Sequence, residues 1–156
     1  MLSRTKKNIL IQDFKIILKN KGLKATPQRL AVHEAMIDLG HACAEDVLGH
    51  ISKTERKSTM TSVYNILSQM ADLGIYSRRL SSTNKMFFDI NTEKHLHLYD
   101  IEEHEFKDII DEEIISYIES KLMRKRFKGY KLDHVEIQLI CRPTKKKPTT
   151  STNKQQ

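Results

Sequence analysis

The amino-acid sequence predicts an α+β fold, with an N-terminal winged helix-turn-helix followed by a small C-terminal α/β domain. Three observations support this prediction. The first half carries four consecutive predicted helices, supported by apolar spacing in the first and fourth and by helix-terminal signals in the second and third, followed by two strand patterns around a polar turn. The second half has strand patterns on either side of one amphipathic helical segment. A chain of 156 residues suits one compact domain or two small ones.

The first two predicted helices are delimited by local capping signals. Gly22 can end the first helix, and Thr26 suits the N-cap of the second. Pro27 fits the first helical position, so the second helix should run to about Leu39 and end at Gly40. The apolar residues of the first helix recur at helical spacing: Leu10, Phe14, Ile17 and Leu18.

The fourth predicted helix divides clearly into two faces. A short third helix is expected over residues 44–52, and Thr59 can cap the fourth. One face of the fourth helix offers hydroxyl and amide groups, which suit the major groove of DNA, with Tyr64 at its boundary. A plain solvated surface is the alternative. The apolar face contains Met60, Val63, Leu67 and Met70, and the polar face contains Thr61, Asn65, Ser68 and Asp72, with Ser62 beside them.

A β-hairpin is expected directly after the fourth helix. Its strands should cover residues 75–80 and 86–90, and it carries the cations Arg78, Arg79 and Lys85. Three helices followed by a basic hairpin have the order of a winged helix-turn-helix. This order and the charge together favour DNA binding.

The charge of the chain is unevenly distributed. Residues 1–90 contain 14 Lys and Arg against 8 Asp and Glu, whereas residues 91–142 contain 9 against 12. Only the first part is therefore expected to meet a polyanion, so residues 1–90 are predicted to form the DNA-binding domain. Residues 143–156 hold 4 lysines and no acidic residue, and without an apolar anchor they should form a disordered basic tail.

The second part, residues 91–142, should combine strands with one helix. A strand is expected over residues 95–99, an acidic connection over 100–107, a helix from about Asp108, and a half-buried strand over 132–141. Roughly 50 residues of this kind make a poor independent core. A second copy of the chain is the simplest partner, so we expect a homodimer and interpret this part as the dimerisation domain. The apolar stripe expected in the helix is Ile110, Ile114, Ile118 and Leu122.

Asp89, His95 and His97 form a candidate metal site at the junction of the two parts. Alternate side chains of an extended segment share one face, so His95 and His97 should point the same way. Two imidazoles at this spacing can bind one divalent ion, and Asp89 can add a carboxylate oxygen. A metal bound here would couple the two parts.

The sequence also limits other function classes. It contains no apolar run long enough to span a bilayer and no signal-peptide core, so we expect a soluble cytoplasmic protein with no membrane partner. Cys43 and Cys141 form no CxxC pair, which disfavours a disulfide scaffold or a tetracysteine zinc site, although a single disulfide stays open. No phosphate-cradling glycine loop or nucleophile elbow is present, so we expect no enzyme. A metal-dependent hydrolase and a plain DNA-architectural protein are the alternatives.

Several motifs in this order resemble the ferric uptake regulator (Fur) superfamily, and the resemblance runs from about Ile9 to Arg142. It implies a homodimeric, metal-responsive transcription regulator, with an N-terminal winged helix and a C-terminal dimerisation domain. The motifs that carry the resemblance are Gly22–Arg29, His41–Asp46, Ser62–Leu67, Phe88–Asp89 and His95–His97.

The resemblance implies a metal site and a set of DNA contacts. Imidazoles combined with carboxylates suit Fe²⁺ or Mn²⁺, with Zn²⁺ as a further candidate. An aspartate at position 108 resembles the peroxide-sensing PerR branch. The implied metal ligands are His41, Asp89, His95, His97 and Asp108. With the helix faces, the resemblance implies base contacts by Thr61, Ser62, Tyr64 and Asn65, phosphate contacts by Arg29 and the wing cations, and a minor-groove contact by Lys24.

The sequence departs from the family pattern at a second zinc site. Many members hold a structural zinc with two CxxC pairs, but Asp100 and Glu103 stand where the first pair would be. Only Cys141 lies near the second pair, so we expect no structural zinc. This absence and the segments Val63–Asn65 and Phe127–Tyr130 also resemble the iron response regulator (Irr) branch, which responds to haem. The native metal and the signal therefore stay open.

Overall fold

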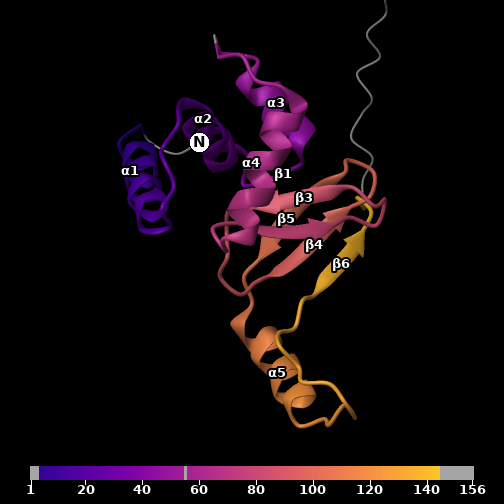
Figure 1. Cartoon of the computed structure of the whole chain (residues 1–156). Helices are drawn as coiled ribbons and strands as arrows, with labels where there is room; N and C mark the ends of the chain where they lie inside the picture. The colour runs from indigo at the N-terminus through magenta and orange to yellow at the C-terminus, as the bar shows by residue number, and fades with distance from the viewer. Residues whose placement is uncertain (1–3, 55, 145–156) are drawn as a thin grey trace, which may run out of the picture. The chain divides into compact units, whose positions relative to one another are not determined.

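The computed structural model describes residues 4–54 and 56–144, and residues 145–156 of the predicted tail lie outside this part (Figure 1). The chain divides into two compact units, one ending at Glu93 and the other beginning at Lys94. None of the described helices is long and apolar enough to cross a membrane.

The first unit has the element order of a winged helix-turn-helix. Its three strands form an antiparallel sheet in the order β1-β3-β2. The hairpin of β2 and β3 confirms the predicted wing, whereas the two-residue strand β1 was not predicted. A segment of two residues carries no periodicity, so only its pairing with β3 reveals it. The elements are α1 (Arg4–Asn20), α2 (Pro27–Leu39), β1 (His41–Ala42), α3 (Ala44–Ile51), α4 (Met60–Asp72), β2 (Ser77–Leu80) and β3 (Met86–Asp89).

The ends of α2 and α4 follow the predicted capping signals. The Thr26 hydroxyl accepts a hydrogen bond from the Arg29 amide at 3.3 Å, and Pro27 occupies the first turn of α2. Gly40 ends α2 at a φ of 70°, a conformation that favours glycine. The Thr59 hydroxyl accepts from the Ser62 amide at 3.2 Å and so begins α4.

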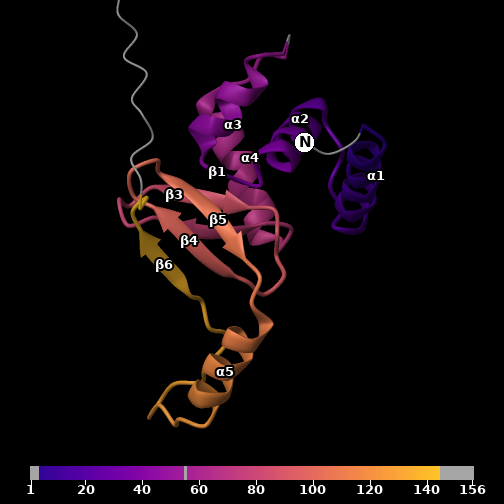
Figure 2. The same ribbon diagram turned by 180° about the vertical axis from the view of Figure 1, so that it is seen from behind.

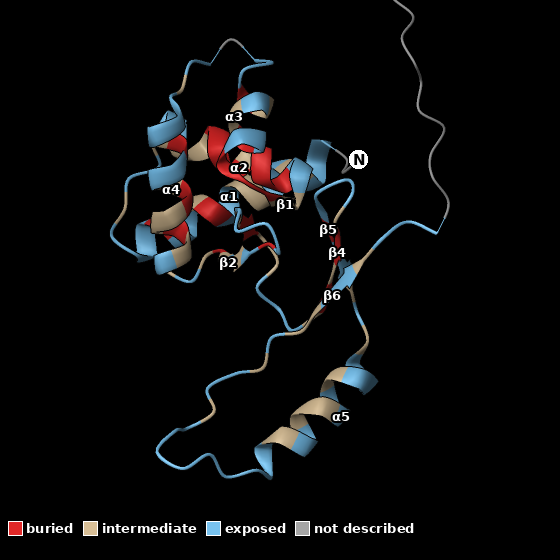
Figure 3. Ribbon diagram, turned by 90° about the vertical axis from the view of Figure 1, so that its right-hand side faces the viewer, coloured by how far each residue is buried: buried red, intermediate tan, exposed pale blue. Residues whose placement is uncertain are grey.

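The core of the first unit lies between its helices and the wing, and Figure 3 shows buried residues along α2, α3 and α4. His33 lies within this core, where its ring stacks on Phe14 with 3.8 Å between ring centroids. Its Nδ1 atom is 2.9 Å from the Tyr76 hydroxyl. Burial lowers the pKa of His33 to about 4, so this histidine is a neutral packing residue at neutral pH. The fully buried apolar residues include Leu18, Val32, Met36, Val47, Val63, Leu67 and Met70.

The second unit has one three-stranded sheet and one helix. In the sheet, β4 lies between β5, to which it is antiparallel, and β6, to which it is parallel (Figure 2). The elements are β4 (Leu96–Asp100), β5 (Glu105–Ile109), α5 (Glu112–Met123) and β6 (Gln138–Cys141).

Three predictions for this unit were wrong in their boundaries. Residues 105–109 form a strand rather than an acidic connection, with Phe106 buried between exposed neighbours. Charged residues flank this single apolar side chain on both sides, so the sequence shows no strand-like alternation here. The helix begins at Glu112, because the Asp111 carboxylate accepts from the Ile114 amide at 2.9 Å and caps it. The last strand covers only residues 138–141 of the predicted 132–141.

The apolar stripe predicted for α5 is not buried within the chain. No residue of α5 is buried, as the absence of red in this helix in Figure 3 shows. Ile110 precedes the helix and is 76% exposed, and Ile114 is 46% exposed. Ile118 and Leu122 are half-buried, so the described residues of one chain cover the apolar face of this helix only in part.

Candidate metal-binding and DNA-binding residues

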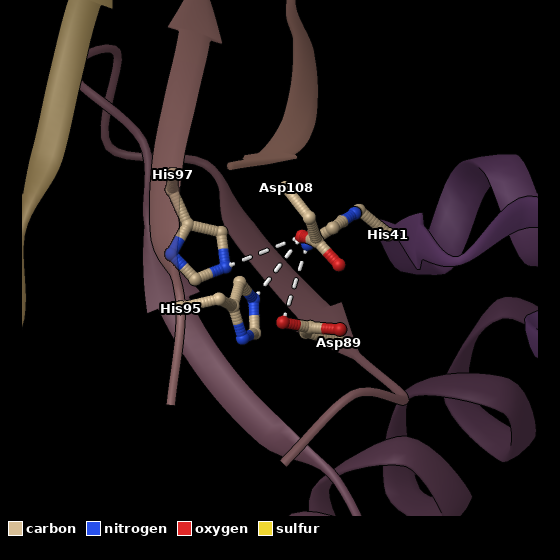
Figure 4. Close-up of side chains that lie close together, drawn as sticks. All are labelled: His41, Asp89, His95, His97 and Asp108. Carbon is tan, nitrogen blue, oxygen red and sulfur yellow. Dashed lines mark ion pairs between the residues drawn. The ribbon is translucent and has the colours of Figure 1, made fainter. Parts of the chain in front are cut away.

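In the first unit, strand pairing brings His41 and Asp89 together. His41 in β1 lies directly opposite Asp89 in β3, and His41 Nε2 is 3.2 Å from Asp89 Oδ2 (Figure 4). Both side chains are largely buried, at 10% and 1% exposure. Arg79 Nε lies 3.9 Å from the same carboxylate oxygen, and the Asn91 amide donates to Asp89 Oδ1 at 2.7 Å. A buried carboxylate needs such partners, and Arg79, predicted only as a wing cation, is one of them.

In the second unit, His95, His97 and Asp108 form a separate group. The register of β4 and β5 places His97 opposite Asp108. Asp108 Oδ1 is 3.1 Å from His95 Nε2 and 3.8 Å from His97 Nε2, and Figure 4 shows both imidazoles facing this carboxylate. The two rings lie 4.1 Å apart between centroids, as the shared strand face predicts. Because Asp108 is in a strand and not at a helix start, it reaches both imidazoles directly.

Each group has the chemistry of a divalent metal site. Neutral imidazole nitrogen and carboxylate oxygen are the donors that suit Fe²⁺, Mn²⁺ and Zn²⁺. The ligand atoms of His95, His97 and Asp108 all lie within 4.8 Å of one another, a spread that one ion can bridge with small side-chain shifts. Each group alone supplies only two or three protein ligands, fewer than the four of a closed zinc site.

The four residues predicted to contact bases all lie in α4. Thr61, Tyr64 and Asn65 are exposed, and Tyr64 rests with its ring edge-on to Phe88, at 6.1 Å between centroids. The Ser62 hydroxyl is partly buried and donates to Gln28 Oε1 at 3.3 Å. Three of the four predicted base-contacting side chains are thus accessible from one face of the helix.

Arg29 has a structural role that the sequence did not predict. Its guanidinium donates to the Lys24 carbonyl at 2.8 Å and to Gln69 Oε1 at 3.0 Å. It therefore ties the loop before α2 to the last turn of α4. Lys24 itself is exposed in this loop. If Arg29 contacts a phosphate, its guanidinium does so while its orientation is fixed by these two hydrogen bonds.

Cys43 and Asp100 are both engaged in local hydrogen bonds, which disfavours a reactive thiol at Cys43 and a second metal site at Asp100. The Cys43 thiol is buried and donates to Asp46 Oδ2 at 2.8 Å. Burial, reinforced by the Asp46 carboxylate, raises the pKa of Cys43 to about 12, so a reactive thiolate is not available. Asp100 accepts hydrogen bonds from the amides of Glu102 and Glu103, which occupies the carboxylate in closing the turn after β4.

Comparison with known proteins identifies the family. A sequence model of the ferric uptake regulator family matches residues 20–140. The Ferric uptake regulation protein of Bordetella parapertussis is 36% identical over 80 residues, which are 50% of this chain and 58% of that protein. The peroxide-responsive repressor PerR of Staphylococcus epidermidis is 28% identical over 82 residues, covering 52% of this chain and 55% of the repressor. The chain thus spans little more than half the length of these relatives.

Solved structures confirm the predicted α+β fold. The Vibrio cholerae ferric uptake regulator superposes with a TM-score of 0.71 at 24% identity, covering 83% of this chain and 98% of that one. The Helicobacter pylori ferric uptake regulator superposes with a TM-score of 0.69 at 18% identity, covering 88% of this chain and 91% of that one. With a family match that spans most of the sequence and a fold shared with these regulators, this chain belongs to the ferric uptake regulator family.

Proposed function

We propose that this protein is a metal-dependent, homodimeric DNA-binding transcription regulator, acting as a repressor of peroxide-stress or iron-homeostasis genes. The observation that carries the proposal is that each unit brings histidine and carboxylate side chains together, His41 with Asp89 in the first and His95 and His97 with Asp108 in the second. Family membership supports the same function. In this proposal residues 1–90 bind DNA, and residues 91–142 form the dimer and complete the metal site.

The metal ion would be held by all five predicted ligands. The three imidazoles are buried or nearly so, and the two carboxylates supply the negative charge that a divalent cation compensates. Fe²⁺ or Mn²⁺ fits this donor set, with Zn²⁺ as a further candidate, and we propose no structural zinc. Solved relatives include a Pseudomonas aeruginosa regulator with manganese and a Francisella tularensis regulator with iron. The proposed ligands are His41, Asp89, His95, His97 and Asp108.

The DNA would be read by the exposed face of α4. Tyr64 is proposed to contact bases or thymine methyl groups, with Thr61, Ser62 and Asn65 beside it. Arg29 and the exposed wing cation Arg78 would hold phosphates, and Lys24 would reach an A·T-rich minor groove. A zinc uptake regulator solved with zinc and DNA, at a TM-score of 0.61, shows that a protein of this fold binds DNA.

The exposed apolar side chains of the second unit support a homodimer. Tyr117 is 62% exposed, Met123 70% and Ile140 59%, and a small unit rarely leaves such a face in water. A second copy would cover this face and place two copies of α4 at a fixed spacing. Two-fold symmetric DNA half-sites match such a dimer.

The regulatory step follows from where the ligands lie in the chain. His41 and Asp89 belong to the first unit, and His95, His97 and Asp108 belong to the second. A metal that binds all five favours the arrangements in which the two groups are together, by its differential affinity for them. DNA affinity would then rise when metal is bound, because the two α4 helices of the dimer would adopt fewer arrangements that do not match the two DNA half-sites.

The proposal is tested by selecting a preferred duplex from a random pool with the Mn²⁺-loaded protein. Binding to that duplex is then measured with Mn²⁺ and with a chelator. We expect binding to weaken at least about tenfold on metal removal, and His95→Ala to lose the metal response while staying dimeric. His134→Ala, an exposed histidine of the same unit, serves as the control. Equal binding with and without metal would contradict the proposal and favour a plain DNA-architectural protein.

The signal is proposed to be peroxide, which the aspartate at position 108 and the similarity to PerR both favour. In the Fe²⁺-loaded protein, one oxygen of peroxide would be inserted into a ring C–H bond of the His41 or His95 imidazole, and the other oxygen would leave as water. Mass spectrometry should then find one added oxygen on either histidine, and none in the Mn²⁺ form. Unmodified histidines together with haem-dependent release from DNA would favour the Irr-like alternative.

A further inference from the structure

A hollow lies between the first turns of α4, the start of α3 and the tip of the wing. Its volume is about 450 Å³, and the predicted base-contacting residues Thr61, Tyr64 and Asn65 form one wall. The wing tip contributes Asn84 and Lys85 to another wall. The residues that complete it are Ala44, Glu45, Met60 and Met86.

The wing tip has a fixed backbone. The Ser81 amide donates to the Lys85 carbonyl at 2.9 Å, and the Lys85 amide donates back to the Ser81 hydroxyl at 3.0 Å. Asn84 lies in the left-handed region at a φ of 61°, which closes the turn. The position of the Lys85 ammonium therefore depends on the conformation of its side chain and on the groups that this side chain contacts.

That partner is Glu45, in the first turn of α3. Lys85 Nζ lies 3.7 Å from Glu45 Oε2, and both side chains are accessible, at 44% and 59% exposure. Glu45 stands where the helix dipole favours an anion. A hydrogen bond with the Cys43 thiol lowers the pKa of Glu45, so this carboxylate is ionised at neutral pH.

This ion pair neutralises the hollow. Among the described residues that line it, Lys85 is the one cation and Glu45 the one anion. A lysine at a wing tip beside a base-reading helix would otherwise contact a phosphate on any sequence, because phosphate contacts carry no sequence information. An acidic side chain within reach of this lysine instead competes with phosphate for its ammonium group.

We propose that Glu45 limits the sequence-independent DNA affinity of this protein by holding the wing-tip Lys85 in an ion pair and away from phosphate. The inference rests on the proposed DNA-binding function but not on its metal dependence. It assigns Glu45 a role in discrimination between operator and bulk DNA, since the restraint weakens the contacts that every duplex offers. Loss of the carboxylate frees one phosphate contact.

The test is a double-mutant cycle on a duplex of random sequence. Affinity is measured from about 50 to about 200 mM salt, a range in which DNA affinity falls steeply with the number of phosphate contacts. The proteins compared are the wild type, Glu45→Gln, Lys85→Gln and the double variant. Glu45→Gln should bind roughly two- to fivefold more tightly, as expected for a released surface ion pair. Its plot of log affinity against log salt should be steeper by about 0.9, the value for one added phosphate. Lys85→Gln and the double variant should match the wild-type protein.

The control is Asp38→Asn, which breaks the contacts of Asp38 with Lys7, at 2.6 Å, and with His50, at 3.1 Å, away from the hollow. It should leave the salt dependence unchanged. The inference is overturned if Asp38→Asn raises affinity as much, or if Glu45→Gln keeps its gain when Lys85 is absent. It is also overturned if Lys85→Gln alone flattens the salt dependence, because Lys85 would then already contact phosphate. Binding to the selected duplex without any metal response would refute only the proposed regulation, whereas no binding to any duplex by any variant would refute both proposals.

Discussion

The buried His33 predicts a specific loss of stability in mild acid. Its pKa is about 4 in the folded protein and 6.5 in an unfolded chain. Between these values the unfolded state binds more protons, so stability is fully present above pH 6.5 and is lost as the pH falls toward 4. The separation of the two values gives about 2 kcal/mol lost at pH 5 and about 3 kcal/mol below pH 4. His33 is only 6% exposed, stacked on Phe14 and in contact with Tyr76, so its charged form would lose most of its solvation by water.

The assay is urea denaturation of the metal-free protein at pH 7.5 and pH 5, followed by far-UV circular dichroism. His33→Gln removes the titrating group but keeps a polar side chain near the Tyr76 hydroxyl. The variant should be less stable than the wild-type protein at pH 7.5, and it should lose about 2 kcal/mol less on acidification. Thr26→Ala, which weakens α2 without removing a titratable group, should lose as much stability on acidification as the wild-type protein. Parallel losses in the wild-type protein and in His33→Gln would refute the reasoning.

Three further predictions follow from the first unit. Thr26→Ala should destabilise the protein by about 1 kcal/mol in chemical denaturation, because α2 loses its N-cap hydroxyl; a loss below about 0.3 kcal/mol would contradict this. In the folded protein at pH 8, iodoacetamide should modify Cys141 and leave Cys43 unmodified, because burial raises the pKa of Cys43 to about 12; rapid labelling of Cys43 would contradict its burial. Tyr64→Ala should lose discrimination between the selected duplex and a random one, whereas Arg29→Ala should weaken binding to both; an equal loss of discrimination in the two variants would refute this division.

Local sequence signals were enough to locate the helices of the first unit. Thr26, Pro27 and Gly40 act within one turn of where they stand, so the bounds of α2 followed directly from the residues. The same holds for Thr59 at the start of α4. Such caps depend on side-chain and backbone groups a few residues apart, and no tertiary contact is needed to infer them.

Pairing between strands could not be inferred in the same way. Strand spacing predicted that His95 and His97 share a face, but nothing local indicates that β5 crosses this face and brings Asp108 to them. His41 meets Asp89 only because a two-residue strand pairs with the wing. His41 and Asp108 entered the predicted site through family resemblance, whereas Asp89 was predicted from its position beside the two histidines. Long-range register depends on the whole fold, which a short segment does not encode.

The second unit shows the other limit of sequence patterns. The apolar stripe around α5 was predicted in a unit too small for a good core of its own, and in one chain Ile110 and Ile114 are exposed while Ile118 and Leu122 are half-buried. An amphipathic pattern indicates that one face of a helix is covered, but it does not identify the covering partner. The exposed part of this stripe supports the proposed homodimer.

The central claim is that one metal is bound by ligands from both units, and Mn²⁺ affinity measured by calorimetry on the full chain tests it most directly. The variants are His41→Ala in the first unit, His95→Ala in the second, and His134→Ala as an exposed control. We predict one ion per chain, an affinity lower by at least about tenfold in both ligand variants, and no change in the control. Full affinity in His41→Ala with loss in His95→Ala would confine the site to the second unit and contradict the claim.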